Sequence, residues 1–405
     1  MPSTSRGPRL RPFRAWRYRV GTDLEAVIAP PYDVLSSEDA DALRARDPHQ
    51  IVHVDLPVAP PGEDRYAAAA RLLRAWQDDG VLVRDPRPSV TVYRMTFRDA
   101  TGRDRALVGV LGGLEVVDEG AGRVLPHERT TPKASTDRLD LTRATQANLS
   151  PVWGLAVGAG LTDALAEPGE ALGVVHAEGV EHAVERVEEP ARIAAIAEVV
   201  GAADVLIADG HHRYGVARAY RDEVRARTGR TDTAAEDTLA FVGELVADQL
   251  AIEAIHRIVR GIPLEALQHA LARDFELVPG AGPARASLLA ELRARGRLAL
   301  LTPDGEATWL VPRESAFAGV RELDGALLEH TLAGTGALVD YQHGVDQVRA
   351  ELARGEATAA VLIRPTSLAE IQRTAAEGLL MPPKSTFFTP KLRTGLVLRG
   401  LDEPA

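Results

Sequence analysis

The chain has 405 residues, 45% of them hydrophobic, and its 47 Lys and Arg are outnumbered by 58 Asp and Glu. This length and composition suit about two to three domains with well-filled cores. The formal net charge of −11 argues against general nucleic-acid binding, because it repels phosphate backbones at long range. The chain contains no cysteine, which excludes disulfides, thiolate nucleophiles and thiolate metal sites. Any catalysis must therefore use oxygen or nitrogen side chains.

The apolar stretches are interrupted by glycine and are too short to span the roughly 30 Å of a membrane's hydrocarbon core. Residues 1–10 are polar and lack the apolar centre of a secretory signal. We therefore expect no membrane partner and, by default, a cytoplasmic protein. The sequence does not determine the oligomeric state and is compatible with a homo-oligomer.

The N-terminal region, residues 1–104, is expected to be α/β. Residues 24–28 resemble a short strand. Residues 64–79 carry apolar side chains at helical spacing and end at Gly80, which predicts an amphipathic helix. A hairpin should follow, because residues 89–97 and 105–117 are both strand-like and a Thr-Gly break separates them.

A central region, residues 105–260, contains the clearest local structure. Residues 204–208 form a buried-strand pattern that runs directly into Asp209-Gly210-His211-His212-Arg213, and a helix leaves this turn and continues to about Arg227. The other elements expected here are strands at 152–157, 172–176, 183–187, 238–246 and 250–259 and helices from about 136 or 137 onward and at 190–200.

The C-terminal region, residues 261–405, begins after a Gly-Ile-Pro break and alternates helices with strands. An irregular loop is expected over residues 381–391. The fold class is therefore α/β with mixed sheets. The expected helices are 264–273, 285–295, 323–333, 345–353 and 365–377, and the expected strands are 298–302, 307–311 and 359–363.

The turn from Asp209 to Arg213 has the chemistry of an anion site. The first turn of a helix presents backbone N–H groups without intrahelical acceptors, and Arg213 adds a guanidinium suited to phosphate oxygens. Asp209 could cap the helix, orient a histidine or hold a metal ion. The alternative is a plain helix cap with two unremarkable histidines. Because His211 and His212 are adjacent, both cannot point at one metal, which argues against a zinc hydrolase.

A second charged segment contains Pro126-His127-Glu128, with the cations Arg129, Lys133 and Arg138 behind it. Glu128 could accept a hydroxyl proton, and the cations could neutralise a phosphate. The alternative is an ordinary solvated loop.

The C-terminal loop carries Lys384-Ser385-Thr386 and Lys391, a basic and hydroxyl-rich set capable of phosphate contacts. We expect one of these lysines within about 10 Å of the Asp209 turn. In the alternative, the loop is structural and its two phenylalanines fill a core. Neither a P-loop nor a dinucleotide-binding glycine motif is present.

These motifs resemble two known groups. Pro126-His127-Glu128 followed by Asp209-Gly210-His211-His212-Arg213-Tyr214 resembles the free L-serine kinases of the ParB/sulfiredoxin-like superfamily. Over nearly its whole length the chain is also similar to the bacterial family catalogued as domain of unknown function 1015. The motifs that carry the second resemblance are these two and residues 29–34, His256-Arg257, 381–388, Pro390-Lys391 and Gly395-Leu396.

The resemblance implies a central ParB/sulfiredoxin-like domain and a kinase that phosphorylates the hydroxyl of free L-serine to give O-phosphoserine. It implies ATP or ADP as donor, with Mg²⁺ held by Asp209. By this resemblance Glu128 is the base on the substrate hydroxyl, and Asp209, His211, His212 and Arg213 hold the donor phosphates with the magnesium ion. Taken together with the residue patterns above, the expected catalytic residues are Glu128, Asp209 and His212. The expected donor-binding residues are Gly210, His211, Arg213, His127, Lys133, Arg138, Lys384 and Lys391.

Glu128 and Asp209 are 81 positions apart, much further than in the small kinases that the motifs resemble. Additional strands and a helix must therefore lie between the two motifs in this chain. Two other functions stay open. One is a ParB-like nucleotide-binding switch, and the other is a phosphate-ester hydrolase in which Glu128 activates water.

Overall fold

The computed structural model describes residues 7–128 and 132–402, which form two compact units. The first unit comprises residues 1–251 and 390–405, and the second comprises residues 252–389. This division differs from the three regions expected from the sequence. The boundary expected after residue 104 falls inside a β-hairpin of the first unit, and the C-terminal segment returns to that unit.

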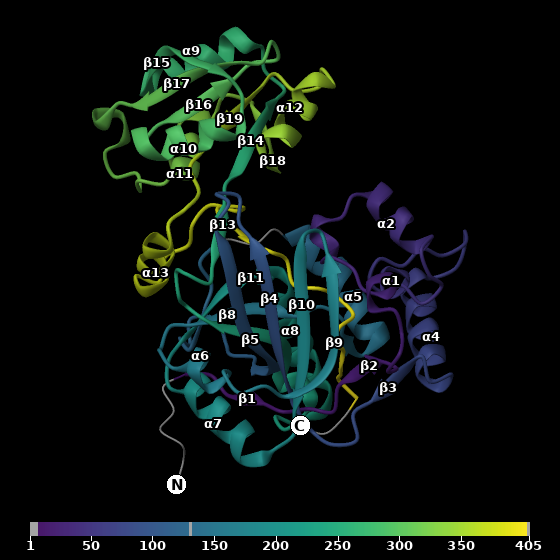
Figure 1. The fold of residues 1–405 in the computed structure, drawn as a ribbon. Coiled ribbons are helices and arrows are strands. Elements are labelled where there is room, and N and C mark those ends of the chain that lie inside the picture. The colour runs from purple at the N-terminus through teal and green to yellow at the C-terminus, as the bar shows by residue number, and fades with distance from the viewer. Residues whose placement is uncertain (1–6, 129–131, 403–405) are drawn as a thin grey trace. The chain divides into compact units, whose positions relative to one another are not determined.

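The first unit contains, within its described residues, a nine-stranded mixed sheet in the order β6-β11-β8-β12-β5-β4-β10-β9, with β1 beside β5 (Figure 1). Two neighbouring pairs, β6 with β11 and β8 with β12, are parallel, and the other pairs are antiparallel. The mixed α/β fold class is confirmed. The strands are β1 (Leu10–Arg11), β4 (Val90–Arg98), β5 (Asp104–Glu115), β6 (Val124–Leu125), β8 (Val152–Ala156), β9 (Glu170–Ala177), β10 (Val180–Val187), β11 (Val205–Asp209) and β12 (Asp237–Glu244).

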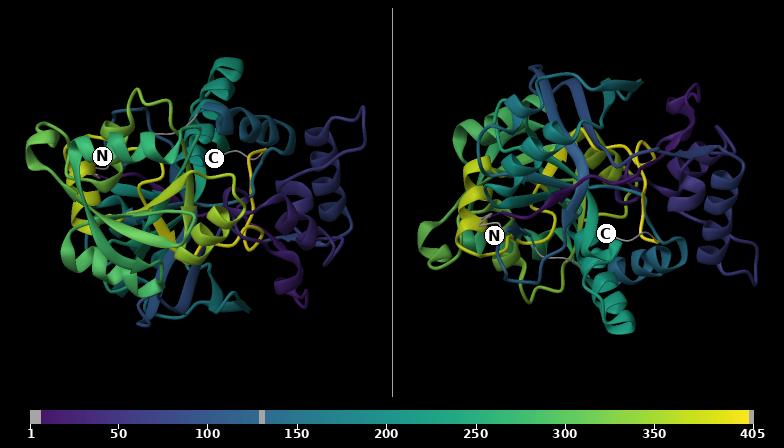
Figure 2. Two further views of the ribbon diagram at one scale, coloured as in Figure 1. Left: turned by 90° about the horizontal axis from the view of Figure 1, so that it is seen from above. Right: turned by 90° about the horizontal axis from the view of Figure 1, so that it is seen from below.

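Helices and short strand pairs complete the first unit (Figure 2). The helical segments are α1 (Leu24–Val27), η1 (Tyr32–Val34), α2 (Ser37–Arg44), α3 (Val52–Asp55), α4 (Arg65–Asp78), α5 (Pro132–Thr145), α6 (Leu161–Ala164), α7 (Pro190–Gly201), α8 (His211–Thr228) and η2 (Ala234–Glu236). The short strands are β2 (Trp16–Tyr18) paired with β3 (Leu82–Arg84), and β7 (Ala147–Asn148) paired with β21 (Arg399–Gly400).

Local sequence explains most of these elements. Asp64 begins α4 by accepting a hydrogen bond from the Tyr66 N–H, and Pro190 occupies the first turn of α7, where its missing N–H costs nothing. Two expectations were wrong. Residues 24–28 contain a helical turn, α1, because Asp23 accepts the Glu25 N–H and caps it, and α5 begins at Pro132 rather than at 136 or 137.

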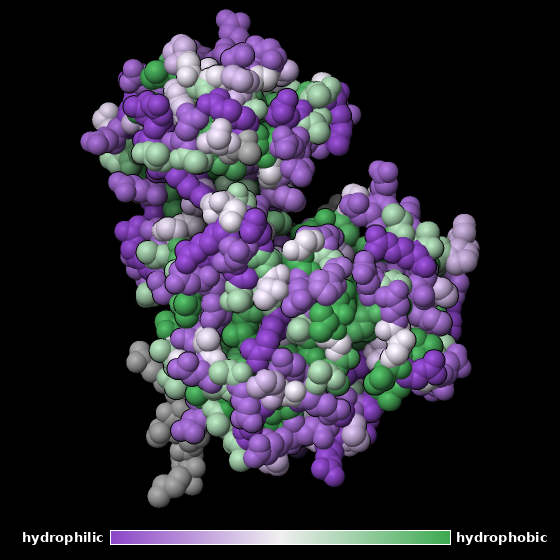
Figure 3. All heavy atoms as spheres, in the orientation of Figure 1, coloured by the Kyte–Doolittle hydropathy of each residue, from purple (hydrophilic) through white to green (hydrophobic). Residues whose placement is uncertain are grey.

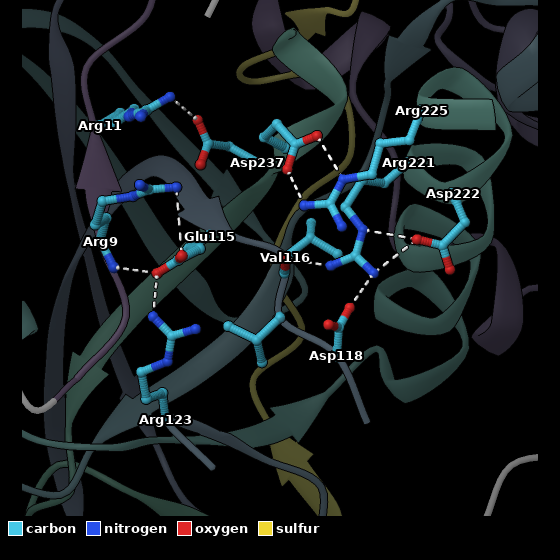
Figure 4. A network of polar contacts seen from close by, with 12 residues as sticks. Arg9, Arg11, Glu115, Val116, Asp118, Arg123, Arg221, Asp222, Arg225 and Asp237 are labelled. Carbon is cyan, nitrogen blue, oxygen red and sulfur yellow. Dashed lines mark hydrogen bonds and ion pairs between the residues drawn. The ribbon is translucent and has the colours of Figure 1, made fainter. Parts of the chain in front are cut away.

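The core of the first unit joins the sheet to the helices. Apolar side chains of β5, β8, β11 and β12 pack with Ile196 and Val200 of α7 and with Tyr214 of α8. Arg221 of α8, only 2% exposed, donates to the Val116 carbonyl at 2.6 Å and to Asp118 Oδ1 at 2.5 Å (Figure 4). Packing and hydrogen bonds together therefore fix α8 against the segment that follows β5.

The second unit has its own six-stranded sheet among the described residues, in the order β15-β17-β16-β19-β14-β18. The sequence pattern missed β15 and β18. Strands of this part are β13 (Ala251–Glu253, at the boundary), β14 (Ile255–Arg260), β15 (Phe275–Pro283), β16 (Leu298–Leu301), β17 (Glu306–Pro312), β18 (Leu338–His343), β19 (Ala359–Leu362) and β20 (Phe387–Thr389). Its helical segments are α9 (Leu264–Asp274), α10 (Ala286–Arg295), η3 (Glu314–Phe317), α11 (Asp324–Leu332), α12 (Val345–Ala353) and α13 (Leu368–Ala376).

The surface carries hydrophobic side chains interspersed with hydrophilic ones on the face drawn in Figure 3. Val174 of the edge strand β9 is among the exposed ones. In the described part of the chain, every helix is too short or too polar to cross a bilayer.

Candidate active site

Two parallel strands bring the Pro-His-Glu and Asp-Gly-His-His-Arg motifs to the same end of the sheet. Val124 and Leu125 of β6 pair in register with Val205 and Leu206 of β11. Because parallel strands share the direction of their carboxyl ends, the residues that follow them emerge side by side, at the sheet edge where α/β proteins usually bind ligands. The two motifs therefore lie close together in space although they are far apart in the sequence.

Gly210 makes the sharp turn between β11 and α8. Its φ of +84° is a left-handed conformation, and a Cβ added there would lie 2.9 Å from Arg213 Nε. Gly210 is also the residue that caps α8, and no side chain caps it, so the expectation that Asp209 might cap this helix was wrong. A register shift in β11 between Ile207 and Asp209 bends the strand just before the turn.

Asp209 is held between two cations. Its Oδ1 accepts a hydrogen bond from Lys391 Nζ at 2.7 Å, and its Oδ2 accepts one from Arg213 Nη2 at 2.5 Å. Arg213 Nη1 also donates to the Pro151 carbonyl. Burial alone would raise the pKa of Asp209, but the ammonium of Lys391 and the guanidinium of Arg213 outweigh it and hold that pKa below its ordinary range.

Lys391 is positioned by a buried network two residues further along the chain. The Arg393 backbone N–H donates to the Tyr93 hydroxyl at 3.4 Å, and Arg393 Nε donates to His182 Nε2 at 3.3 Å. Tyr93 and His182 in turn contact each other at 2.7 Å. Burial lowers the pKa of His182 to about 3, so its imidazole is neutral and can accept this bond.

His127 and His211 form a buried pair of neutral imidazoles, with ring centroids 4.7 Å apart. His127 Nδ1 donates to the Ile207 carbonyl at 2.6 Å, and the His127 backbone N–H donates to His211 Nε2 at 3.4 Å. Burial lowers the pKa of His127 to about 4 and that of His211 well below its ordinary value. Since Nε2 of neutral His211 accepts, its proton sits on Nδ1, which lies 3.7 Å from Glu128 Oε1.

The structure thus brings Glu128, His127 and His211 together, and Asp209, Arg213 and Lys391 together, at adjoining positions around one turn. His212, the second residue of α8, is half-buried. The side chain of Lys133 and all of Arg129 lie outside the described residues. The catalytic and binding roles of all these residues stay predictions.

Arg138 belongs to a neighbouring cluster. Its Nη1 donates to the Asp55 carbonyl at 2.6 Å, its Nη2 donates to Asp137 Oδ2 at 2.5 Å, and its guanidinium stacks 4.3 Å from the centre of the Tyr32 ring. Burial raises the pKa of Tyr32 to about 12. Sequence reasoning missed Asp55, for which a four-residue helix offers no pattern. Tyr32 belongs to the motif at residues 29–34, but the sequence does not predict its contact with Arg138.

Lys384 lies in the second unit and stays a predicted donor ligand. Its backbone, with φ of +57°, is fixed by Arg257, whose Nη1 donates to the Lys384 carbonyl at 3.2 Å. Ser385 Oγ donates to the Pro382 carbonyl at 2.7 Å, and Phe388 is buried. The His256-Arg257 and 381–388 motifs therefore meet within this unit.

The residues at the turn do not form a ready magnesium site. In residues 7–128 and 132–402, no group of three or more His, Asp or Glu side chains is placed to hold a metal ion. Each oxygen of Asp209 accepts a hydrogen bond from a cation, so the positive charges of Lys391 and Arg213 would oppose binding of Mg²⁺ at Asp209.

Fold and site together define a mixed α/β protein with a charged strand-turn-helix site. The model of the family described as a protein of unknown function, DUF1015, matches residues 10–326. The chain belongs to the DUF1015 family, as its motifs indicated. The segment around Lys391 lies outside the matched residues.

Among solved structures, a free serine kinase in complex with AMP is similar at 13% identity, with a TM-score of 0.38, covering 67% of this chain and 88% of the other. A conserved hypothetical protein from Pyrococcus furiosus has 11% identity and a TM-score of 0.38, covering 67% and 92%. SbnI with a C-terminal truncation, from Staphylococcus aureus, has 13% identity and a TM-score of 0.37, covering 70% and 85%. No curated protein matches the chain.

Proposed function

We propose that this protein is a kinase that transfers the terminal phosphoryl group of a nucleotide to the hydroxyl of free L-serine. The observation that carries the proposal is the convergence of Lys391 and Arg213 on Asp209 at the N-terminus of α8, beside Glu128. Phosphoryl transfer needs mainly positioning and charge neutralisation, with one acceptor for the hydroxyl proton.

The cations and the helix N-terminus position the donor phosphates and neutralise their charge. Lys391, Arg213 and the first-turn N–H groups of α8 can bind phosphate oxygens, which compete with the carboxylate of Asp209 for the same donors. Because Lys391 and Arg213 contact different oxygens of Asp209, a phosphate arriving there would meet two separate cations. Asp209 keeps both cations in place when no phosphate is bound.

Glu128 is the acceptor for the hydroxyl proton. Its neighbour His211 is a neutral imidazole, so His211 adds no positive charge that would weaken Glu128 as a proton acceptor. In the proposed step the serine Oγ–phosphorus bond forms, the bond from phosphorus to the nucleotide's bridging oxygen breaks, and the hydroxyl proton passes to Glu128. The nucleotide leaves with one phosphate fewer.

The choice of L-serine and of ATP or ADP rests on the two motifs shared with free L-serine kinases. The test is to incubate the full chain with Mg²⁺, ATP or ADP, and a pool of amino acids, and to follow products by phosphorus NMR and mass spectrometry. We expect O-phosphoserine. Inorganic phosphate without any phosphoamino acid would indicate a hydrolase, and nucleotide binding without product would indicate a switch. Either result would overturn the proposal.

A further inference from the structure

A small cavity lies beside Arg213 in the first unit, bounded by α5, α8, β7 and the start of β12. Its volume is about 60 Å³, which accommodates about four to six water-sized groups. Nucleotide-sized ligands usually occupy pockets of about 300–1,000 Å³, so this cavity is too small to enclose one. A very small organic molecule is the right size.

The cavity is lined by charged side chains at two places that belong to separate clusters. Arg138 and Arg213 line it together with Tyr32 and Asp55. Asp237 lines it elsewhere and is paired with Arg11, at 3.3 Å from Arg11 Nη1 to Asp237 Oδ2 (Figure 4). The walls between are mostly apolar, and include Val216, Ala217 and Tyr220 of α8.

Two buried polar atoms of these clusters make no hydrogen bond to any described residue. They are Arg213 Nε, a donor, and Asp237 Oδ1, an acceptor. Asp237 is only 3% exposed. A buried carboxylate oxygen and a buried guanidinium N–H without partners cost free energy, and such groups are usually satisfied by water or by a ligand. The complementary ligand offers an acceptor to the arginines and a donor to Asp237.

We propose that this cavity binds a small zwitterionic α-amino acid, with its carboxylate toward Arg138 and Arg213 and its ammonium toward Asp237. A carboxylate suits the guanidinium groups, and an ammonium suits an unpartnered carboxylate oxygen. Arg213 belongs to both the cavity and the Asp209 turn, which places the amino acid next to the proposed phosphate site. The inference rests on the proposed function, because it identifies the pocket in which the proposed kinase would bind L-serine, its phosphoryl acceptor.

The test is calorimetric titration of the full chain with L-serine, with and without AMP. Ethanolamine, which lacks the carboxylate, and glycerate, which lacks the ammonium, are the matched probes. We expect L-serine to bind and each probe to bind about tenfold or more weakly, since each probe leaves a buried polar atom without a hydrogen-bond partner. Equal binding of all three, or no L-serine binding under either condition, would overturn the inference and leave ordered water as the only occupant.

A cavity-filling variant separates a ligand pocket from a water-filled void. Ala217→Leu adds bulk to the wall and replaces no polar group, whereas Ala219→Leu, on the same helix but outside the lining, is the control. We expect Ala217→Leu alone to weaken L-serine binding about tenfold or more, with nucleotide binding unchanged. Wild-type L-serine affinity in Ala217→Leu would contradict the pocket.

The two proposals fail in different ways. If Ala217→Leu still makes O-phosphoserine with the wild-type Michaelis constant for L-serine, the cavity assignment is wrong and the kinase stands. If L-serine binds and Ala217→Leu abolishes that binding, but no nucleotide ever gives O-phosphoserine, the pocket stands and the kinase is wrong.

Discussion

Lys391 Nζ lies 2.7 Å from Asp209 Oδ1, although the two residues are 182 positions apart. The contact exists because the C-terminal segment returns to the first unit, where Leu398 pairs with Trp16 and Thr394 pairs with Ala29. A lysine from the end of the chain thus meets a carboxylate at the end of β11. Both side chains are largely buried, so the ion pair is protected from screening by salt.

Lys391→Met removes this ammonium and should weaken binding of the nucleotide donor about tenfold to a hundredfold, as expected for one lost charge-assisted hydrogen bond. Isothermal titration with ATP and ADP measures the effect, and Lys391→Arg should restore most of the affinity. If Lys391→Met only lowers the melting temperature and leaves donor affinity intact, the ion pair is purely structural.

Glu128→Gln keeps the shape of the side chain beside His211 but removes the proton acceptor. We expect a decrease in kcat for O-phosphoserine formation of about 10²- to 10⁴-fold, the usual cost of losing a general base, with donor affinity unchanged. Glu198→Gln, at an exposed position of α7, is the matched control. Near-wild-type turnover of Glu128→Gln would remove Glu128 from the base role.

The buried histidines make stability depend on pH. Burial lowers the pKa of His127 from 6.5 to about 4, so between these values the unfolded chain binds a proton that the folded protein does not. The stability that neutral His127 contributes is complete above pH 6.5 and is lost as the pH falls toward 4, by about 3 kcal/mol in total. His211 acts in the same direction.

NMR titration of the His127 imidazole, assigned by the signal that disappears in His127→Gln, checks the pKa directly. Urea unfolding at pH 7, 6 and 5 should give a decreasing free energy of unfolding. A His127 midpoint near 6.5 would show that the imidazole is not buried as described.

Local patterns predicted the elements that carry their own signals. The α4 helix has a capping Asp64 and regular apolar spacing, and the β11-turn-α8 unit has a buried strand followed by Gly210. By contrast, α1 is only four residues long, too short for a helical period to appear, so its sequence resembles a strand. Short elements therefore need the tertiary structure to define them.

The candidate site was predictable only in part for the same reason. Its two motifs stood out because charged residues surround fixed turns, but their meeting depends on the parallel pairing of β6 with β11. Asp55 and Asp237 belong to no recognisable motif. Only their burial among residues distant in sequence identifies them as candidates for the site. Long-range contacts of this kind leave no periodic trace in a single sequence.

Gly210→Ala tests whether the turn conformation holds Arg213 in place. A non-glycine residue at a φ of +84° is strained, so the substitution should lower the free energy of unfolding by about 1–2 kcal/mol. The new Cβ would also approach Arg213 Nε to 2.9 Å and displace the guanidinium from Asp209. We therefore expect lower stability in urea unfolding together with weaker nucleotide binding.

Gly215→Ala is the control for this variant, because Gly215 lies within α8, has nothing within 4 Å of an added Cβ and needs no left-handed conformation. Replacing it with Ala should stabilise the protein by about 0.4–1 kcal/mol through the lower entropy of the unfolded chain. Its nucleotide affinity should stay at the wild-type value. If Gly210→Ala lost stability but bound nucleotide as well as Gly215→Ala does, the position of Arg213 would not matter for the donor, and the phosphate site would have to rest on Lys391 and the helix N-terminus alone.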